Sequence, residues 1–403
     1  MTIAKGVATK VAYAKESAWG VAASGAGVSK YLRRVSSDLN LEKDVYESAE
    51  IRTDYQVADM RHGVRRATGS LNGELSAGTY ADFIAGALAR DFTAVTAATG
   101  LTVDIAASGV LFTVTRSAGD FIADGFKAGQ VVRLTGAGLN AANVGNNLLV
   151  VSLTATVLTV KVLSATTLVA EAAIAAVTAT VVGKVTFAPL TGHTDDSFTI
   201  EKWFSDIAQS EVYTGMKVGS VAVQLPASGL VTTDISFSGK DMEITGTTQY
   251  FTAATISGTE NVYAAVNGAM TVNGELVALI TSMDFTVDRA PENLSVVGSN
   301  QTAAIITGRI RATGNMSVYF VDTKFRDYFD DETPVAVTVA LTASEAKDAN
   351  VVAFTFPKVK LGSFTKDDTE NALTASASFT ALLKEANTVG LPETTLYVQD
   401  TSL

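Results

Sequence analysis

The string RATGSL at residues 66–71 returns as RATGNM at residues 311–316, an offset of 245 residues between Arg66 and Arg311. Neighbouring positions agree with the same offset: Gly63 falls on Gly308, Asp82 on Asp327, and the aromatic pair Tyr80 and Phe83 on Phe325 and Tyr328. Self-similarity at a fixed offset indicates one structural unit that occurs twice. The sequence therefore predicts two related domains.

A short helix is expected directly after each copy of this string. In the first copy, Phe83, Ile84, Ala87 and Leu88 form one apolar face, and Thr79 with Asp82 has the spacing of a capping box. In the second copy, Phe325, Tyr328 and Phe329 repeat the i, i+3, i+4 pattern. Each helix is expected to follow a strand and to cover a sheet.

A second echo locates an insertion. MKVGSV at residues 216–221 matches VKLGSF at residues 359–364, where Lys217 falls on Lys360 with an offset of only 143. The two offsets differ by 102 residues, so the first copy contains an insertion of that size between Asp82 and Lys217. Composition narrows its borders, because Lys161 and Glu171 are the only charged residues between positions 134 and 183.

Period-two alternation dominates the remainder, as in SVAVQL, MDFTVDR and AVTVAL. This pattern is typical of β-sandwiches and barrels. We therefore predict a mainly β fold, with two tandem sandwich or barrel domains that each carry one short helix, and a small inserted all-β domain. The predicted domains are residues 1–93 with 191–270, the insert at 94–190, and residues 271–403. Edge strands of such sheets template pairing unless they are blocked or used, and two tandem copies could use them on each other.

Bulk composition restricts the function. The net charge of −11 argues against binding nucleic acid by phosphate neutralisation. The absence of cysteine removes disulfides, thiolate metal sites and cysteine nucleophiles. The first residues lack the continuous apolar core of a secretory signal, so we expect the protein to be made and first used in a cytoplasm.

Candidate chemistry is sparse. His193, Asp195 and Asp196 are compatible with a metal site or with a polar turn, and His62 is expected in a surface turn. Two acidic runs, Asp330, Asp331 and Glu332, and Asp367, Asp368 and Glu370, are expected to be solvated loop ends or at most a weak calcium site. We expect no catalytic residue, no metal and no cofactor. A glycosidase needs only two well-placed carboxylates, so a polysaccharide-cleaving enzyme stays open as an alternative.

Several stretches resemble the major tail tube proteins of long, non-contractile phage tails. They are AYAKESAWGVAA at residues 12–23, LNLEKDVYESAEIRTDYQVADMRHG at 39–63, RRATGSLNGEL at 65–75, and the segment that begins FTIEKWF at 198. The resemblance covers most of the chain outside the insert. It implies a tube domain of two packed sheets with a flanking helix, and rings of six such domains that stack into a conduit for DNA.

The same resemblance implies an inter-ring contact at residues 39–62, with residues 285–307 as a shorter and less charged counterpart. The contact residues that it implies are Glu42, Asp44, Tyr46, Glu47, Glu50, Arg52, Asp54, Tyr55, Asp59 and Arg61.

Two copies per chain predict that three chains fill six positions, as a trimeric pseudo-hexameric ring. The expected partners are further copies of the chain, a tape measure protein and viral DNA that pass through the lumen without specific binding, and tail terminator and distal tail proteins. The insert is expected to point outward. The expected location is the virion tail, after assembly in the host bacterial cytoplasm, with no membrane. Another tail ring, baseplate or terminator protein and a tandem β-sandwich surface adhesin are the alternatives.

Overall fold

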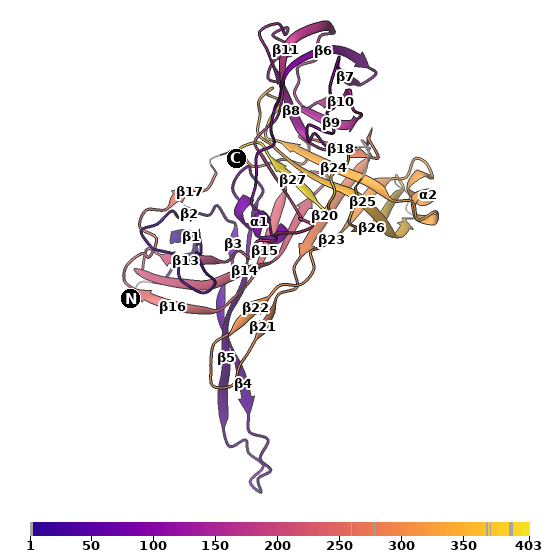
Figure 1. Ribbon diagram of the computed structural model, residues 1–403. Coiled ribbons are helices and arrows are strands. Elements are labelled where there is room, and N and C mark those ends of the chain that lie inside the picture. Colours follow the sequence, from indigo (N-terminus) through magenta and orange to yellow (C-terminus); the bar gives the residue numbers. More distant parts are fainter. Residues whose placement is uncertain (1–2, 259, 278, 368–369, 371, 387–389) are drawn as a thin grey trace.

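A computed structural model describes residues 3–258, 260–277, 279–367, 370, 372–386 and 390–403 (Figure 1). The chain is mainly β, as the alternating pattern predicts, and the described residues hold two α-helices and one 3-10 turn, Gly6–Ala8. A long twisted body lies in the middle of the molecule. A small barrel caps one end, and a narrow hairpin projects from the other end (Figure 1).

One long antiparallel sheet runs through the whole body. Its strands, in order of pairing, are β3 (Ser36–Ser37) and β4 (Asn40–Glu47), then β5 (Met60–Glu74), β15 (Thr232–Gly239), β14 (Gln209–Leu225), β20 (Ile280–Asp288), β23 (Arg311–Tyr319), β26 (Thr374–Ala381) and β25 (Val351–Lys366). We call β3, β4, β5, β15 and β14 the first strand set, and β20, β23, β26 and β25 the second strand set. Direct pairing of β14 with β20 joins the two sets.

The two sets share an unusual local detail. In β14, the register with β15 shifts between Val218 and Ser220, and the Ser220 hydroxyl lies 2.7 Å from that of Ser236. In β25, the register with β26 shifts between Leu361 and Ser363, and the Ser363 and Ser378 hydroxyls are also 2.7 Å apart. The KVGS and KLGS strings therefore form the same β-bulge, with one extra residue at the glycine.

Shorter strands complete the body around these sets. Beside the first set lie β1 (Thr9–Lys15), β2 (Lys30–Tyr31), β13 (Phe198–Phe204), β16 (Asp241–Gly246) and β17 (Thr255–Ile256); beside the second lie β12 (Lys184–Phe187), β18 (Gly268–Val272), β19 (Glu275–Leu276), β24 (Val335–Thr342) and β27 (Tyr397–Asp400). β14 takes part in two sheets, since its first residues pair with β13 and β16 and its last with β15 and β20.

Helix α1 (Ala81–Leu88) buries the predicted face, with Phe83 fully buried and Ile84, Ala87 and Leu88 at most 8% exposed. The capping-box prediction is wrong. The helix begins after Tyr80 without a side-chain cap, because the Thr79 hydroxyl bonds Ser76 and the Asp82 carboxylate accepts from Tyr13 and Lys30. Helix α2 (Lys324–Asp330) is less buried, with no fully buried residue.

A single apolar core extends under both strand sets. In the first set the rings of Phe83, Phe198 and Phe237 meet at centroid distances of 5.0–5.2 Å. In the second set Phe285 meets Phe354 and Phe356 at 5.0 and 5.1 Å. All belong to one contact cluster, so the two sets stabilise each other by burying a shared apolar surface.

The small barrel closes in the order β10–β7–β6–β11–β8–β9 around its own core. Its strands are β6 (Ala98–Ser108), β7 (Leu111–Arg116), β8 (Val131–Thr135), β9 (Leu148–Leu153), β10 (Val157–Val162) and β11 (Glu171–Val181). The barrel follows α1 in sequence but packs against the second strand set. Val131 and Leu149 join Val351 and Ala353 in one buried cluster, and the buried Gln399 amide bonds the backbone of Val131 on both its N–H and its C=O.

Candidate functional site: the arm and the open sheet face

The hairpin of β4 and β5 extends well beyond the body, and we call residues 40–66 the arm (Figure 1). Residues 45–62 are exposed throughout, so this stretch has no buried face. Of the segment predicted as a stacking loop, residues 40–47 and 60–62 are strand and residues 48–59 are loop, and His62 lies in β5 opposite Val45 rather than in a turn. Period-two patterning fails to show these strands because both faces meet water.

The ten predicted contact residues all lie on this arm. The ion pairs inside the arm are Arg52 with Asp54 (2.8 Å), Arg61 with Asp59 (2.9 Å), and Arg66 with Asp44 (2.7 Å) and Glu42 (3.4 Å). The Tyr46 ring covers Gly63. Three further contact residues, Glu47, Glu50 and Tyr55, are exposed. At the tip, the Arg52 guanidinium lowers the pKa of the Asp54 carboxyl by a direct hydrogen bond. The charges of the arm are therefore mostly paired with each other.

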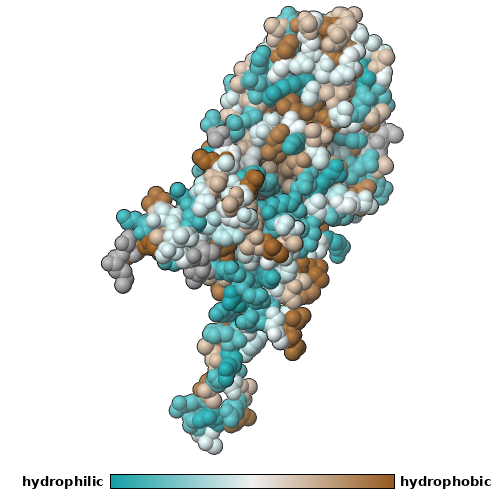
Figure 2. All heavy atoms as spheres, turned by 60° about the vertical axis from the view of Figure 1, so that its left-hand side comes forward, coloured by the Kyte–Doolittle hydropathy of each residue, from teal (hydrophilic) through white to brown (hydrophobic). Residues whose placement is uncertain are grey.

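Apolar side chains at the tip were not singled out by sequence reasoning, Tyr55 excepted. Ile51 and Tyr55 are each 99% exposed, and Val57 is 65% exposed. The space-filling view shows the arm as a mostly hydrophilic stalk that carries isolated hydrophobic side chains (Figure 2). Ile51, Tyr55 and Val57 nevertheless lie within seven residues of one another at the tip and have no cover from the body of the chain.

A second, shorter hairpin lies against the base of the arm. It consists of β21 (Glu292–Leu294) and β22 (Ala304–Ile306). The Arg65 N–H donates to the Asn300 carbonyl (2.8 Å), and the Asp241 carboxylate accepts from Arg65 (2.6 Å) and Gln301 (2.7 Å). Residues 285–307, which the resemblance implies as the counterpart of the arm, contain this hairpin, and it is docked on its own chain.

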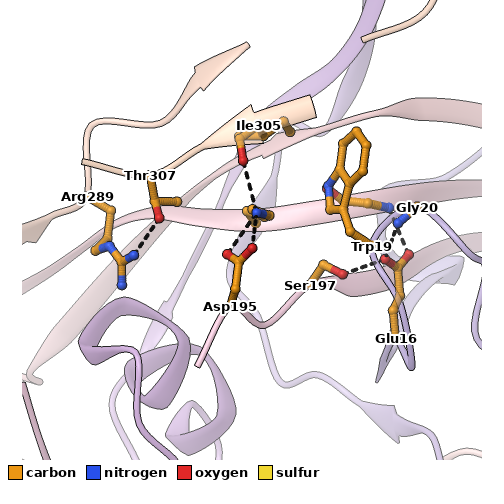
Figure 3. A network of polar contacts seen from close by, with 10 residues as sticks. Glu16, Trp19, Gly20, Asp195, Ser197, Arg289, Ile305 and Thr307 are labelled. Atoms are coloured by element: carbon orange, nitrogen blue, oxygen red, sulfur yellow. Dashed lines mark hydrogen bonds and ion pairs between the residues drawn. The ribbon is translucent and has the colours of Figure 1, made fainter. Parts of the chain in front are cut away.

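A buried lysine strengthens this docking (Figure 3). The Lys217 ammonium lies between the Asp195 carboxylate, at 2.7 and 2.8 Å, and the Ile305 carbonyl, at 3.0 Å. Nearby, Arg289 donates to the Thr307 hydroxyl (2.5 Å) and reaches the Ala87 carbonyl at the end of α1 (3.5 Å). These contacts tie β14, α1 and the second hairpin together.

The neighbouring carboxylate in Figure 3 is also structural. Glu16 is 8% exposed and accepts from the Gly20 and Gly215 N–H groups and from the Ser197 and Thr199 hydroxyls. Multiple hydrogen bonds satisfy this buried charge. Its oxygens are occupied by the fold itself.

The face of the long sheet that points away from the core is largely polar, with Ala222 and Tyr319 as apolar exceptions. Buried residues alternate with hydroxyl, amide and acidic side chains, and the polar positions line up across the strands: Thr68, Ser70, Asn72 and Glu74; Thr232, Asp234 and Ser236; Ser220 and Gln224; Asp284, Thr286 and Asp288; Thr313, Asn315 and Ser317; Ser376, Ser378 and Thr380; and Ser363 and Thr365. Arg66 on β5, Arg311 on β23 and Lys360 on β25 add cations on this face. We call this surface the open face.

The candidate metal ligands are drawn into separate ion pairs. Asp195 binds Lys217, and Asp196 binds Lys15 at 2.8 Å. Within the described ranges, no group of three or more His, Asp or Glu side chains is placed to hold a metal ion. In the acidic runs, Glu332 pairs with Lys360, Asp330 lies 3.8 Å from Arg326, and Asp368 lies outside the described residues. No helix in the described part of the chain is long and apolar enough to cross a membrane.

Comparison with known families gives one match. A family model described as phage tail tube protein matches residues 6–381. Comparison with curated individual proteins gives no match.

Proposed function

This chain belongs to the phage tail tube protein family, and we propose that it polymerises into stacked rings that form the tube of a long, non-contractile tail and conduct DNA during ejection. The family is structural, and it places the chain in the virion tail. The observation that carries the proposal is the long sheet. Among the described residues it ends in two edges that are partly without a neighbouring strand, and it turns a largely polar face outward.

The edges of this sheet are suited to association. Past Val359, β25 pairs with β26 on one side, and no described strand lies on its other side. The outer side of β4 is likewise without a strand among the residues described here. Unpaired N–H and C=O groups template pairing with another chain, and closure into a ring removes such edges. Rings form when a head-to-tail contact repeats around an axis.

The number of chains per ring follows from duplication, which we propose for the two strand sets. The shared bulge, the matched serine pairs and the offset of 245 residues between β5 and β23 support one unit written twice. If each set fills one of six positions, three chains complete a ring.

The open face is the proposed wall of the lumen. It carries hydroxyl and amide groups, the acidic Glu74, Asp234, Asp284 and Asp288, and the three cations Arg66, Arg311 and Lys360. Duplex DNA has one negative charge per about 1.7 Å of its axis, so a wall rich in cations would retain it. A neutral to acidic wall lets DNA and a tape measure protein pass without specific binding.

The arm is the proposed contact between successive rings, through the ten residues implied by the resemblance together with Ile51 and Val57. The barrel lies at the end of the molecule opposite the arm, and we propose that it projects from the outside of the tube (Figure 1). Tail terminator and distal tail proteins would cap the two ends, and assembly would take place in the host cytoplasm.

Negative-stain microscopy of the purified protein at high concentration tests this function. Hollow tubes with a regular axial repeat support it. Single closed rings that never stack favour a terminator or baseplate ring protein instead. Monomers that bind or cleave a glycan would reject the tube in favour of an adhesin or a glycan-cleaving enzyme.

A further inference from the structure

We propose that the seam between the two strand sets of one chain is repeated between neighbouring chains, with residues 363–365 pairing antiparallel with residues 40–42 of the next chain and Lys43 binding Glu332 across the contact. This inference rests on the proposed ring. It adds the edge, the register and the charge pair that close the ring.

The internal seam serves as the template. β14 and β20 pair from Ser220 opposite Asp288 to Leu225 opposite Met283. Val221, Val223, Phe285 and Val287 on the core side are each at most 3% exposed. The core side of the contact between β14 and β20 is therefore buried from water.

In the proposed contact between chains, β25 of one chain takes the place of β14. The two β-bulges match Ser220 with Ser363, at an offset of 143 residues. The residue before each bulged glycine lies opposite a phenylalanine, Val218 opposite Phe237 and Leu361 opposite Phe379. In β14 the edge beyond the bulge is covered by β20. In β25 that edge is open, and Phe364 remains only partly buried against the core.

On the other side, residues 37–42 take the place of β20. Leu71 corresponds to Met316, at the offset of 245 residues. Ser37 lies opposite Leu71, and Met283 lies opposite Met316, so Ser37 corresponds to Met283. This correspondence superimposes Leu39 on Phe285, and both are buried (0% and 1% exposed). Leu41 falls on Val287 but is only partly buried.

Transposing the register places Ser363 opposite Glu42, Phe364 opposite Leu41, and Thr365 opposite Asn40. Phe364 and Leu41 then meet where Val221 meets Val287 inside the chain, so two partly buried apolar side chains become fully buried. The pairing stops at residue 40, since the Leu39 carbonyl already accepts from Tyr213 (2.9 Å) and Lys202 (3.2 Å).

A charge pair completes the analogy. Directly after β20, the Arg289 N–H donates to the Gly219 carbonyl (2.8 Å), and its side chain reaches the Ala87 carbonyl at the end of α1. The corresponding residues are Lys43, Gly362 and, at the end of α2, Glu332. Lys43 is exposed, and the Glu332 side chain is 79% exposed, so the two surfaces carry opposite charges.

Disulfide trapping tests the register, because the natural chain has no cysteine. Residues directly opposite each other in an antiparallel pair have Cβ atoms about 4.5–5.5 Å apart. Oxidation of assembled Asn40→Cys/Thr365→Cys protein should therefore give a covalent trimer. Asn40→Cys/Ser376→Cys is the matched control, since Ser376 lies opposite Thr365 on β26 and is therefore a second strand spacing of about 4.8 Å further from residue 40. Each single variant should also stay uncrosslinked.

The outcomes separate this inference from the function on which it rests. If the Asn40→Cys/Thr365→Cys protein forms rings or tubes but does not cross-link, the proposed pairing between chains is wrong and the tube function stands. The same holds if the control cross-links equally well. Failure of the cysteine-free parent to assemble at all overturns both.

A charge exchange provides a second test that needs no cross-link. Glu332→Lys should raise the critical concentration for assembly several-fold, as sedimentation of polymer measures. This loss alone has two causes, because Glu332 also binds Lys360 of its own chain at 2.9 Å. Restoration by Lys43→Glu in the double variant supports a contact between chains, and a double variant no better than Glu332→Lys contradicts it.

Discussion

The two hairpins of this chain differ in what they contact. The hairpin of β21 and β22 lies on the first strand set. It is held there by Lys217, by Asp241 and by the Arg65 backbone N–H, which donates to the Asn300 carbonyl. The arm projects into solvent, its charges are paired internally, and Ile51 and Tyr55 at its tip are 99% exposed. The β21–β22 hairpin thus makes its contacts within the chain, whereas the tip of the arm is free to contact another molecule.

The corresponding lysines of the KVGS and KLGS strings, Lys217 and Lys360, differ in the same way. Lys217 is 4% exposed and binds the second hairpin, whereas the Lys360 side chain is 40% exposed and binds Glu332 at the surface. The same sequence motif is thus completed by the chain itself in one place and left uncovered in the other. Four variants test whether the comparison holds.

The largest effect is expected from Lys217→Met. The change leaves the buried Ile305 carbonyl without its donor, which costs about 1–3 kcal/mol of unfolding free energy. Denaturant unfolding measures the loss, and hydrogen exchange should rise over residues 290–310. Lys360→Met is the matched control, with an expected change within about 1 kcal/mol because its ion pair is exposed. Equal losses in the two variants would mean that the second hairpin is not held by Lys217.

A smaller loss is expected from Asp241→Asn. This side chain is 5% exposed and accepts from both Arg65 and Gln301. The amide keeps one acceptor and removes the charge, so we expect a loss of about 1 kcal/mol or slightly more, since hydrogen bonds to charged groups contribute about 1.5–3 kcal/mol. Thermal unfolding is the measurement. An unchanged midpoint would show that the contact between the arm base and the second hairpin is dispensable.

No change in stability is expected from Ile51→Ser with Tyr55→Ser, since surface substitutions alter unfolding free energy by less than about 0.5 kcal/mol. Tube formation should nevertheless fail, with rings still formed. Val297→Ser, at an equally exposed position of the docked hairpin, is the control and should leave tubes intact. Normal tubes from the tip variant would remove the arm from the ring-to-ring contact.

The smallest effect is expected from Asp54→Asn. The Arg52–Asp54 pair is fully solvated, so its loss should leave the melting temperature unchanged at neutral pH. Because Arg52 lowers the pKa of Asp54, any contribution of the pair is present at neutral pH and disappears as the pH falls through that lowered pKa. A clear drop in melting temperature would show that the tip is more ordered by this pair than its exposure implies.

Much of the architecture was predictable from local patterns. The apolar spacing of Phe83, Ile84 and Leu88 predicted α1, and the KVGS and KLGS strings predicted equivalent strands whose shared bulge the structure displays. The mainly β fold is confirmed. Two-copy domain boundaries and the ten arm contacts stay predictions.

Other features left no local signal. The strands of the arm have no buried face, so alternation could not indicate them. Docking of the barrel on the second strand set depends on two buried glutamines. Gln130 donates to the Tyr397 hydroxyl, and Gln399 bonds the Val131 backbone, so each partner lies more than 260 residues away in sequence. The buried Glu16 reads as a surface residue in sequence, because its donors come from residues 197, 199 and 215.

Mass measurement of single rings tests the central claim most directly. Native mass spectrometry of rings released from tubes should give about 126 kDa, three times the 41.9 kDa chain, because each chain supplies two of six positions. A ring of six chains, near twice that mass, would contradict the account.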